Sequence, residues 1–300
     1  MDDALRARLN ANSMTLGQGC GMTQLPVPEP PHESRVWFIT GASRGLGHAF
    51  AEAALAAGDR VVAAARDTSA LDVLGRGHGG RLVPLPLDVS RRADVFAAVE
   101  RATAAFGRLD VVVNNAGQLL FGMVEEATEE QARAHLDINF FGALWVTQAV
   151  LPVLRAQGSG HLFQVTAMGA GGGAAGTGLY GAGKAALAAV GEAVAAEVEP
   201  FGIHVTVLEP GGYDTGLGHL GTTATTPHPA YDGARAALEA SWSASPPPAA
   251  AAAVVLALSR TDSPPRRIVL GDRAYDDVVA DQRNRLHAYT DWEHLSREGG

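Results

Sequence analysis

A tyrosine and a lysine four residues apart, Tyr180 and Lys184, are the residues of this sequence best suited to move a proton. Four residues make about one helical turn, so the two side chains would lie on one face of a helix. A free tyrosine ionises at about pH 10 and is a poor acid–base group at neutral pH. A neighbouring ammonium favours the phenolate and lowers the pKa of the tyrosine. We therefore expect Tyr180 to act as a general acid or base that is assisted by Lys184.

Short apolar segments that alternate with helical segments must position this pair. Apolar character that is nearly continuous along a strand indicates burial on both faces, as in a parallel sheet. The alternation predicts an α/β fold, a single doubly wound domain with a mostly parallel seven-stranded sheet flanked by helices. The predicted strands are 35–40, 59–66, 81–89, 109–117, 160–168, 202–210 and 266–271, and the predicted helices are 47–58, 90–106, 126–157, 180–200 and 246–259.

We expect three parts along the chain. Residues 1–34 end in the proline-rich stretch PVPEPPHES and are predicted to form a disordered leader. Residues 35–271 carry the alternating elements and include a long loop at 212–245, which we interpret as a lid over the substrate and call the lid segment. Residues 272–300 have apolar side chains at helical spacing and are predicted to form a C-terminal helical extension.

The stretch TGASRGLG lies between the first predicted strand and the first predicted helix. Its glycines allow a tight turn and let a pyrophosphate approach the helix N-terminus, where free N–H groups favour negative charge. A glycine-rich connection without a ligand is the alternative, but the position between strand and helix favours nucleotide binding. The predicted cofactor contacts in this turn are Gly41, Ser43, Arg44, Gly45, Leu46 and Gly47.

The spacing G-x-x-x-G-x-G of this turn resembles that of the short-chain dehydrogenase/reductase family. Further motifs follow in the family's order, namely Asp88-Val89, NNAG at 114–117, Asn139, the Tyr180–Lys184 pair and PGGYDT at 210–215. The resemblance implies a Rossmann-type fold and a nicotinamide cofactor. It also implies an oxidoreductase that interconverts a carbonyl and a hydroxyl group on a small, hydrophobic molecule.

The resemblance further implies roles for single residues. Asp88 would contact the adenine ring, Lys184 would hold the nicotinamide ribose, and Asn139 would bend a helix and hold a water beside Lys184. Asp88 could instead form an Asx turn, and Asn139 could be a polar helix residue that the backbone satisfies. The remaining cofactor contacts implied by the resemblance are Val89, Asn115, Ala116, Gly117, Pro210, Gly211, Tyr213 and Thr215.

Arg66 favours NADP(H) over NAD(H). An NAD site places an acidic residue about 20 positions after the glycine turn, at the end of the second strand. That position falls at Ala65, and Arg66 follows it, with Arg44 as a second cation that could bind a 2′-phosphate. A shift of one residue would make Asp67 the acid of an NAD site. Arg66 and Asp67 could also be ordinary solvated charges of a loop.

The sequence departs from the family at the serine that hydrogen-bonds the substrate oxygen. This serine lies thirteen residues before the tyrosine, and Ala167 stands there. Loss of one such donor typically lowers the rate by about 10²–10³. Thr166 is our candidate replacement and fourth catalytic residue beside Asn139, Tyr180 and Lys184, although neighbouring residues of a strand point to opposite faces.

A donor from the lid segment is the second explanation for the missing serine. His219 and Trp242 are expected beside the substrate, as is Ala167, and His219 could supply the missing polarity. Weak redox activity is the third explanation. It leaves two other functions open, a non-redox isomerase, dehydratase or cyclase that uses Tyr180, or a sensor that binds NADP(H) with weak turnover.

Composition limits the classes of partner. A net charge of −9 argues against nucleic acid and anionic membranes as partners. Cys20 is the only cysteine, the clean apolar run at 249–258 is short for a membrane helix, and we find no metal-type His/Cys spacing. We expect a cytoplasmic enzyme, and the family resemblance implies a homodimer or homotetramer formed through the helices at 126–157 and 180–200.

Overall fold

The computed structural model describes residues 33–217, 221–241 and 245–299. The predicted leader, except for its last two residues, lies outside the described residues, as do His219 and Trp242. The chain divides into two units after Glu33, and the fold described below is that of the second unit, residues 34–300.

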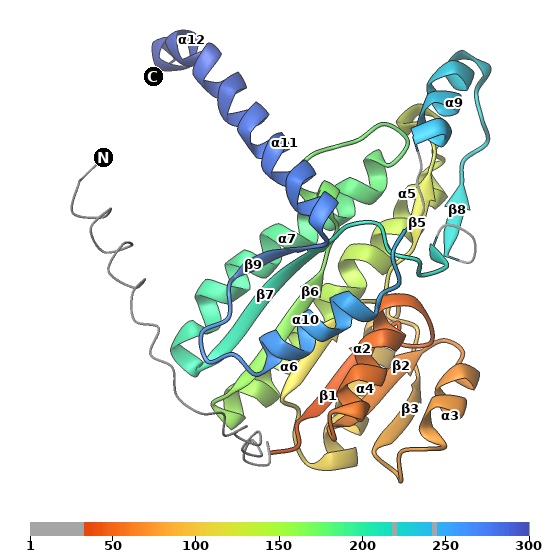
Figure 1. The fold of residues 1–300 in the computed structure, drawn as a ribbon, viewed down its shortest axis with the longest axis vertical. Coiled ribbons are helices and arrows are strands. Elements are labelled where there is room, and N and C mark those ends of the chain that lie inside the picture. The colour runs from red at the N-terminus through yellow and green to blue at the C-terminus, as the bar shows by residue number, and fades with distance from the viewer. Residues whose placement is uncertain (1–32, 218–220, 242–244, 300) are drawn as a thin grey trace, which may run out of the picture. The chain divides into compact units, whose positions relative to one another are not determined.

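Seven strands form one parallel sheet in the order β3-β2-β1-β4-β6-β7-β9 (Figure 1). The prediction of a doubly wound α/β fold with a seven-stranded parallel sheet is therefore confirmed. The strand order reverses between β1 and β4, and open α/β sheets bind ligands at such a switch point, beyond the carboxyl ends of the strands. The strands are β1 (Val36–Thr40), β2 (Arg60–Ala65), β3 (Leu82–Pro86), β4 (Val111–Asn114), β6 (Gly160–Val165), β7 (Ile203–Pro210) and β9 (Arg267–Leu270).

Helices cover both faces of the sheet because successive side chains of each strand point to opposite sides. Val36 and Phe38 of β1 belong to one apolar core, whereas Trp37 and Ile39 belong to the other. The first core is covered by α4 (Arg92–Phe106), α6 (Ala143–Gln157) and α7 (Gly178–Val198), and the second by α2 (Gly45–Ala56), α3 (Ser69–Gly75) and α10 (Ala249–Ser259).

The lid segment contains secondary structure that the sequence did not indicate. β8 (Thr222–Ala224) pairs in parallel with β5 (Leu119–Phe121), a short strand that follows the NNAG motif. The 3₁₀ turns η1 (Val124–Glu126) and η5 (Pro229–Tyr231) and the helix α9 (Asp232–Ser241) complete this region. The described part of the lid segment thus lies beside β5, above the carboxyl end of the sheet (Figure 1).

A continuous helical run of 29 residues, Glu129–Gln157, comprises α5 (Glu129–Leu136), the π-helical turn η2 (Asp137–Gly142) and α6. By length and composition alone this run could cross a membrane, which is weak evidence because core helices pass the same test. Here its apolar side chains pack on the sheet, with Val146 and Leu154 fully buried. We read it as a core helix, although only 33% of its most apolar window is buried in the single chain.

The C-terminal tail is helical, as its spacing predicts. α11 (Asp272–Asp291) and α12 (Glu293–Glu298) follow β9, and α11 packs on η3 (Met168–Gly171), the turn after β6. The rest of this helical arm projects away from the sheet (Figure 1) and leaves Leu286, Tyr289 and Trp292 exposed.

Candidate active site

Tyr180 and Lys184 lie one turn apart at the start of α7, where the carboxyl end of β6 meets the helix. Lys184 is buried, with 4% of its surface exposed, and its Nζ donates a hydrogen bond to the carbonyl of Val165 at 2.8 Å. Nζ lies 5.9 Å from the centre of the Tyr180 ring. The two residues therefore share one face, as their spacing predicts, and a strand carbonyl fixes the ammonium beside the phenol.

Burial shifts the pKa values of both members of the pair. It raises the pKa of Tyr180 to about 12 and lowers the pKa of Lys184 to about 8. We expected Lys184 together with a positive nicotinamide ring to lower the pKa of Tyr180; in the protein without the cofactor, burial raises it instead. The cost of burying a phenolate outweighs the attraction of an ammonium that is itself buried and bound to Val165.

Thr166 is not oriented to replace the missing serine. Its side chain is 1% exposed, and its hydroxyl donates to the Leu208 carbonyl of β7 at 2.7 Å. A substrate carbonyl needs a donor, and this hydroxyl has a single proton. Ala167, the next residue, is extended and partly exposed. The alternation of a regular strand thus persists to Ala167, and no shift of register turns Thr166 toward the cleft.

Asn139 lies in the helical distortion that the family resemblance implies. It is fully buried in the π-helical turn η2, where one extra residue widens the helix between α5 and α6. Its Oδ1 accepts from the main-chain N–H of Gln118 at 3.2 Å, and its Nδ2 donates to the carbonyl of His135 at 3.1 Å. The side chain therefore ties the distorted helix to the segment that follows the NNAG motif. Neither Gln118 nor His135 was among the predicted site residues.

The glycine turn can only be built from glycine at several positions. Gly41 and Gly45 have φ values of 65° and 59°, in the left-handed region that favours glycine. A Cβ on Gly47 would collide with Nδ2 of Asn115 and would lie 2.5 Å from the carbonyl oxygen of Gly41. Such close approach of backbone to backbone leaves a cradle at the start of α2 that fits a pyrophosphate group.

Asn115 and Thr40 hold this cradle together. Asn115 Nδ2 donates to the carbonyls of Thr40 at 2.9 Å and Gly41 at 3.1 Å. The hydroxyl of Thr40 accepts from the main-chain N–H groups of Asn115 and Ala116, both at 3.1 Å. Asn115 was predicted as a cofactor contact, and here it supports the turn, whereas Thr40 was missed because its partners lie about 75 residues away.

The remaining residues of the turn lie at the mouth of the cradle. Arg44 is exposed and caps α2 without a side-chain hydrogen bond to the helix, whereas Ser43 is partly buried. Leu46 packs on the core cluster that includes Trp37. The geometry thus leaves the guanidinium of Arg44 free to approach an anion at this end of the helix.

The end of β2 presents Arg66 to solvent, whereas Asp67 is engaged. Arg66 is exposed directly after the last strand residue, Ala65. Asp67 Oδ1 accepts from the main-chain N–H and the hydroxyl of Ser69, at 2.9 and 2.6 Å, and these hydrogen bonds lower the pKa of Asp67. The carboxylate therefore shapes the start of α3, and the cation is the group that faces outward.

Asp88 forms the Asx turn that we considered as an alternative. Its Oδ1 accepts from the main-chain N–H of Ser90 at 3.0 Å and from the Ser90 hydroxyl at 2.7 Å. Val89 is buried, and a Cβ on Gly142 would lie 2.7 Å from its Cγ2, so Val89 packs against the π-helical turn. Asp88 stays partly exposed, so the turn is compatible with a contact to an adenine ring.

The PGGYDT motif brings the carboxyl end of β7 over the glycine turn. Pro210 ends the strand, and a Cβ on Gly211 would lie 2.6 Å from Ala274 of α11. A Cβ on Gly45 would lie 2.8 Å from Cβ of Thr215, which therefore closes over the cradle. Tyr213 is partly buried against the core, and the loop thus brackets the space above the turn.

A buried carboxylate, Glu126, fastens the lid segment to the body of the domain. Its side chain is 1% exposed and accepts hydrogen bonds from the Thr225 hydroxyl at 2.6 Å, the His228 main-chain N–H at 2.9 Å and Arg235 Nη2 at 2.7 Å. These donors, led by Arg235, lower the pKa of Glu126 to about 2. The carboxylate therefore stays ionised at neutral pH and holds β8, η5 and α9 in place.

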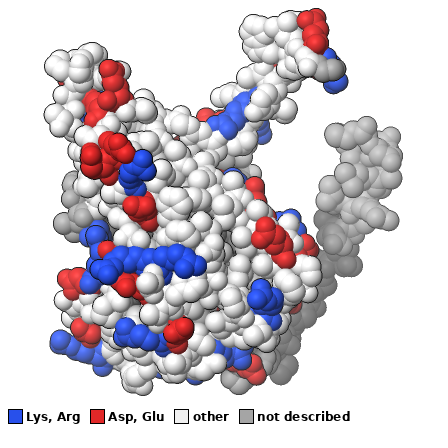
Figure 2. Space-filling view, turned by 180° about the vertical axis from the view of Figure 1, so that it is seen from behind, with Lys and Arg blue, Asp and Glu red and all other residues white. Residues whose placement is uncertain are grey.

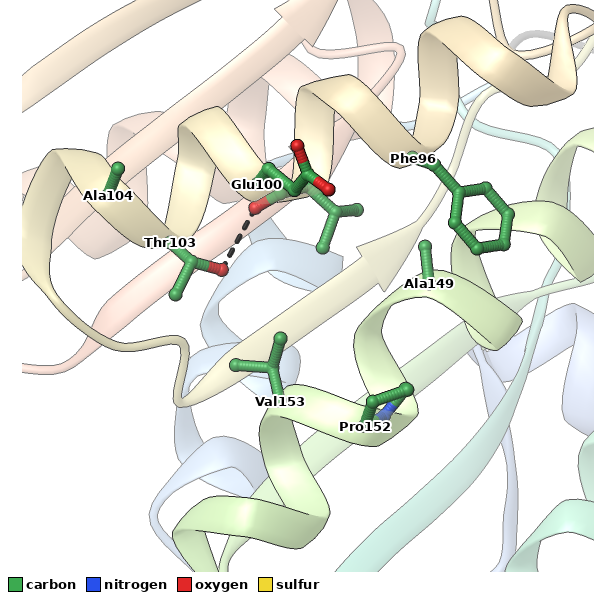
Figure 3. A pocket seen from close by; sticks show the side chains of 8 residues that line it. Phe96, Glu100, Thr103, Ala104, Ala149, Pro152 and Val153 are labelled. Carbon is green, nitrogen blue, oxygen red and sulfur yellow. Dashed lines mark hydrogen bonds between the residues drawn. The ribbon is translucent and has the colours of Figure 1, made fainter.

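A groove on the outer surface, between α4 and α6, contains none of the predicted site residues (Figure 3). Phe96, Val99, Ala149 and Val153 make it largely apolar. On the face drawn in Figure 2, acidic and basic side chains are interspersed. Within the residues that the structure describes, no cluster of three His, Cys, Asp or Glu side chains suited to a metal ion occurs.

Comparison with known proteins agrees with this geometry. Residues 35–223 match the family described as short chain dehydrogenase. The chain is 41% identical over 249 residues to the oxidoreductase BOA17 of Botryotinia fuckeliana, covering 81% of this chain and 91% of that protein. A short-chain dehydrogenase from Streptomyces avermitilis superposes with a TM-score of 0.84 at 37% identity, over 90% of this chain and 99% of that one. A short chain dehydrogenase from Burkholderia cenocepacia in complex with NADP gives a TM-score of 0.69 at 28% identity, over 85% and 97% of the two chains.

Proposed function

The chain belongs to the short-chain dehydrogenase family and is an oxidoreductase, and we propose that it interconverts a carbonyl and a hydroxyl group on a small, hydrophobic molecule with NADP(H). The observation that carries the proposal is the placement of the Tyr180–Lys184 pair. A Cβ on Gly117 would lie 3.3 Å from Lys184 Nζ, and one on Gly41 would lie 2.8 Å from Cα of Ala116. The proton-transfer pair is thus joined through the NNAG segment to the glycine cradle.

Tyr180 supplies the proton of the reduction. When NADPH is bound, it provides the hydride for the carbonyl carbon. As that C–H bond forms, the carbonyl oxygen gains negative charge and takes the hydroxyl proton of Tyr180, which leaves a phenolate beside the Lys184 ammonium. A pKa of about 12 keeps the phenol of the free protein protonated at neutral pH. We therefore expect reduction to proceed at neutral pH and alcohol oxidation to be favoured by alkaline pH.

The preference for NADP(H) rests on Arg66 and Arg44. Both guanidinium groups are exposed at the cradle side of the sheet, and the competing carboxylate of Asp67 is held by Ser69. The similar Burkholderia cenocepacia protein was solved in complex with NADP. We expect Arg66→Ala to raise the KM for NADPH by about tenfold or more, because a charge-assisted contact to the 2′-phosphate is lost, with little effect on NADH. Equal changes for both cofactors would contradict this assignment.

The substrate oxygen is activated mainly by Tyr180 in this proposal. Ala167 has no polar group, and the hydroxyl proton of Thr166 is engaged by Leu208. The nearby lid wall is apolar, since a Cβ on Gly176 would lie 2.8 Å from the Phe121 ring and 3.0 Å from Leu238. These apolar side chains favour the proposal that the substrate is hydrophobic.

The test is NADPH consumption with a panel of hydrophobic ketones and aldehydes. Tyr180→Phe should lower kcat by about 10²–10⁴ while NADPH binding, measured by fluorescence titration, is retained. Ala167→Ser restores a donor at the family position and should raise kcat for the same substrates. Unchanged kcat in Tyr180→Phe would contradict the proposal. An NADPH-binding protein that converts none of the panel would favour the sensor or the non-redox alternative.

We also propose that two or four copies assemble through the helices on the α4–α6–α7 side. Only 33% of the most apolar window of Glu129–Gln157 is buried in the single chain, and the groove between α4 and α6 is apolar. Burial of such surface favours association. Light scattering should give a mass of about twice or four times the 31.0 kDa of one chain. A monomer at micromolar concentration would contradict the assembly without affecting the proposed reaction.

A further inference from the structure

His135 is a buried titratable residue that the proposed reaction does not use. It lies near the end of α5, one turn before Asn139, and only 1% of its surface is exposed. Asn139 Nδ2 donates to its main-chain carbonyl and also lies 3.2 Å from its Nδ1 and 3.3 Å from its Nε2. The centre of its ring is 6.1 Å from that of the Tyr180 ring. His135 thus contacts the distorted helix on one side and faces the proposed catalytic tyrosine on the other.

The contact with Asn139 requires an uncharged ring. The Asn139 amide nitrogen is almost equally far from the two ring nitrogens, so it lies over the face of the imidazole and away from the in-plane lone pairs. The face of a neutral aromatic ring attracts an N–H donor, whereas an imidazolium repels it. Tyr180 and Lys184, both on α7, are the titratable groups that face this ring. Burial and the positive charge of Lys184 lower the pKa of His135 to about 4. The geometry of the ring contact and the electrostatics therefore agree on a neutral imidazole at physiological pH.

Asn139 connects this imidazole to Lys184. A Cβ placed on Gly117 would lie 2.9 Å from Asn139 Oδ1 and 3.3 Å from Lys184 Nζ, so the amide and the ammonium flank the same glycine. Asn139 Oδ1 is held by the main-chain N–H of Gln118. The amide is therefore held at both ends, by the main-chain N–H of Gln118 and by the carbonyl and ring of His135.

We propose that His135 is a positioning residue for Tyr180 and Lys184, and that the face of its uncharged ring holds the Asn139 amide and thereby the place of the lysine ammonium. The effect of His135 on turnover rests on the proposed function. The effect of His135 on the pKa of Lys184 does not, because that pKa can be measured without a substrate.

The test compares two substitutions of similar length in the full chain. His135→Phe keeps an uncharged aromatic face for Asn139, whereas His135→Met fills a similar volume without one. Lys184 is the only lysine in the sequence, so ¹³Cε-lysine labelling gives a single side-chain lysine resonance whose titration reports its pKa. Circular dichroism and thermal unfolding establish that each variant is folded.

We expect His135→Met to move the pKa of Lys184 by about half a unit or more and His135→Phe to leave it near the wild-type value. In turnover, His135→Met should lower kcat about tenfold and leave the KM for NADPH unchanged. It should also shift the part of the pH–rate profile that follows the titration of Lys184. His135→Phe should retain most of the wild-type kcat. Equal effects of the two substitutions, or none, would overturn the proposal and leave His135 a packing residue.

A separate measurement covers the case in which His135→Met does not fold. ¹⁵N-imidazole NMR of the wild-type chain should show His135 as a neutral ring at pH 6, and an imidazolium there would overturn the proposal. If the wild-type protein converts no carbonyl or alcohol, the proposed function fails. The titration of Lys184 in the two variants still decides the role of His135.

Discussion

Lys184→Met should make the protein more stable at neutral pH while it abolishes turnover. The reason is that the ammonium is buried, with 4% of the residue exposed, and the nearest group that it binds is a neutral carbonyl. Its pKa falls from 10.5 to about 8. At about 1.4 kcal/mol per pKa unit, this shift means that the charged form costs the folded state about 3 kcal/mol. Loss of the hydrogen bond to Val165 offsets about 1 kcal/mol, which leaves a net gain of about 2 kcal/mol.

The pH dependence gives the sign of this effect. Below pH 8 Lys184 is protonated in both the folded and the unfolded state, so the full cost of burial is present. Between pH 8 and 10.5 the folded protein releases the proton while the unfolded chain retains it, so the free energy of unfolding rises with pH. The wild-type protein should therefore approach the stability of Lys184→Met as the pH rises through this window.

Urea unfolding at pH 7, 8, 9 and 10 measures this difference, and the subtraction of the two curves removes contributions from every other titrating group. The single lysine resonance of the ¹³Cε-labelled protein gives the pKa of Lys184 directly. A pKa near 10.5 in the folded protein would refute the reasoning, as would a Lys184→Met variant that is less stable than wild type at pH 7.

Three further substitutions test other parts of the site. Gly47→Ala should weaken NADPH binding by about tenfold or more in fluorescence titration, because the added Cβ forces the cradle open; unaltered binding would exclude a tight turn. Glu126→Gln should weaken the charged contact with Arg235, raise the substrate KM and speed limited proteolysis within 222–241; equal cleavage rates would show that the carboxylate does not hold the lid segment. Thr166→Val should leave kcat within about twofold of wild type, because its hydroxyl serves Leu208; a tenfold loss would return Thr166 to the reaction.

The fold and the proton-transfer pair could be predicted because their signals are local. Apolar strands and the helical spacing of Tyr180 and Lys184 depend on neighbours within a few residues, and the seven predicted strands all occur. The glycine turn was recognisable for the same reason, since a positive φ at Gly41 and Gly45 favours glycine at each of these positions. Such local patterns can be recognised in the sequence without knowing which other parts of the chain pack against them.

Contacts between distant parts of the chain could not be predicted in this way. Glu126 binds Arg235, 109 residues later, and nothing in the separate stretches links the two. The pKa of Tyr180 was expected to fall because the neighbouring charge was visible in the sequence and the extent of burial was not. Thr166 was proposed as a donor because its partner, Leu208, belongs to a strand 42 residues away.

The two prolines of β3 have a consequence for how copies of this protein meet. Among the residues that the structure describes, β3 is the outermost strand on one side of the sheet and pairs only with β2. Leu87 donates its main-chain N–H to Ala65 of β2, so the nitrogens of Pro84 and Pro86, an odd number of residues away, face outward. Proline has no N–H to offer there. Because these two N–H donors are missing, this edge cannot pair fully with a strand of another molecule. The prolines therefore protect the protein against edge-to-edge aggregation at high concentration.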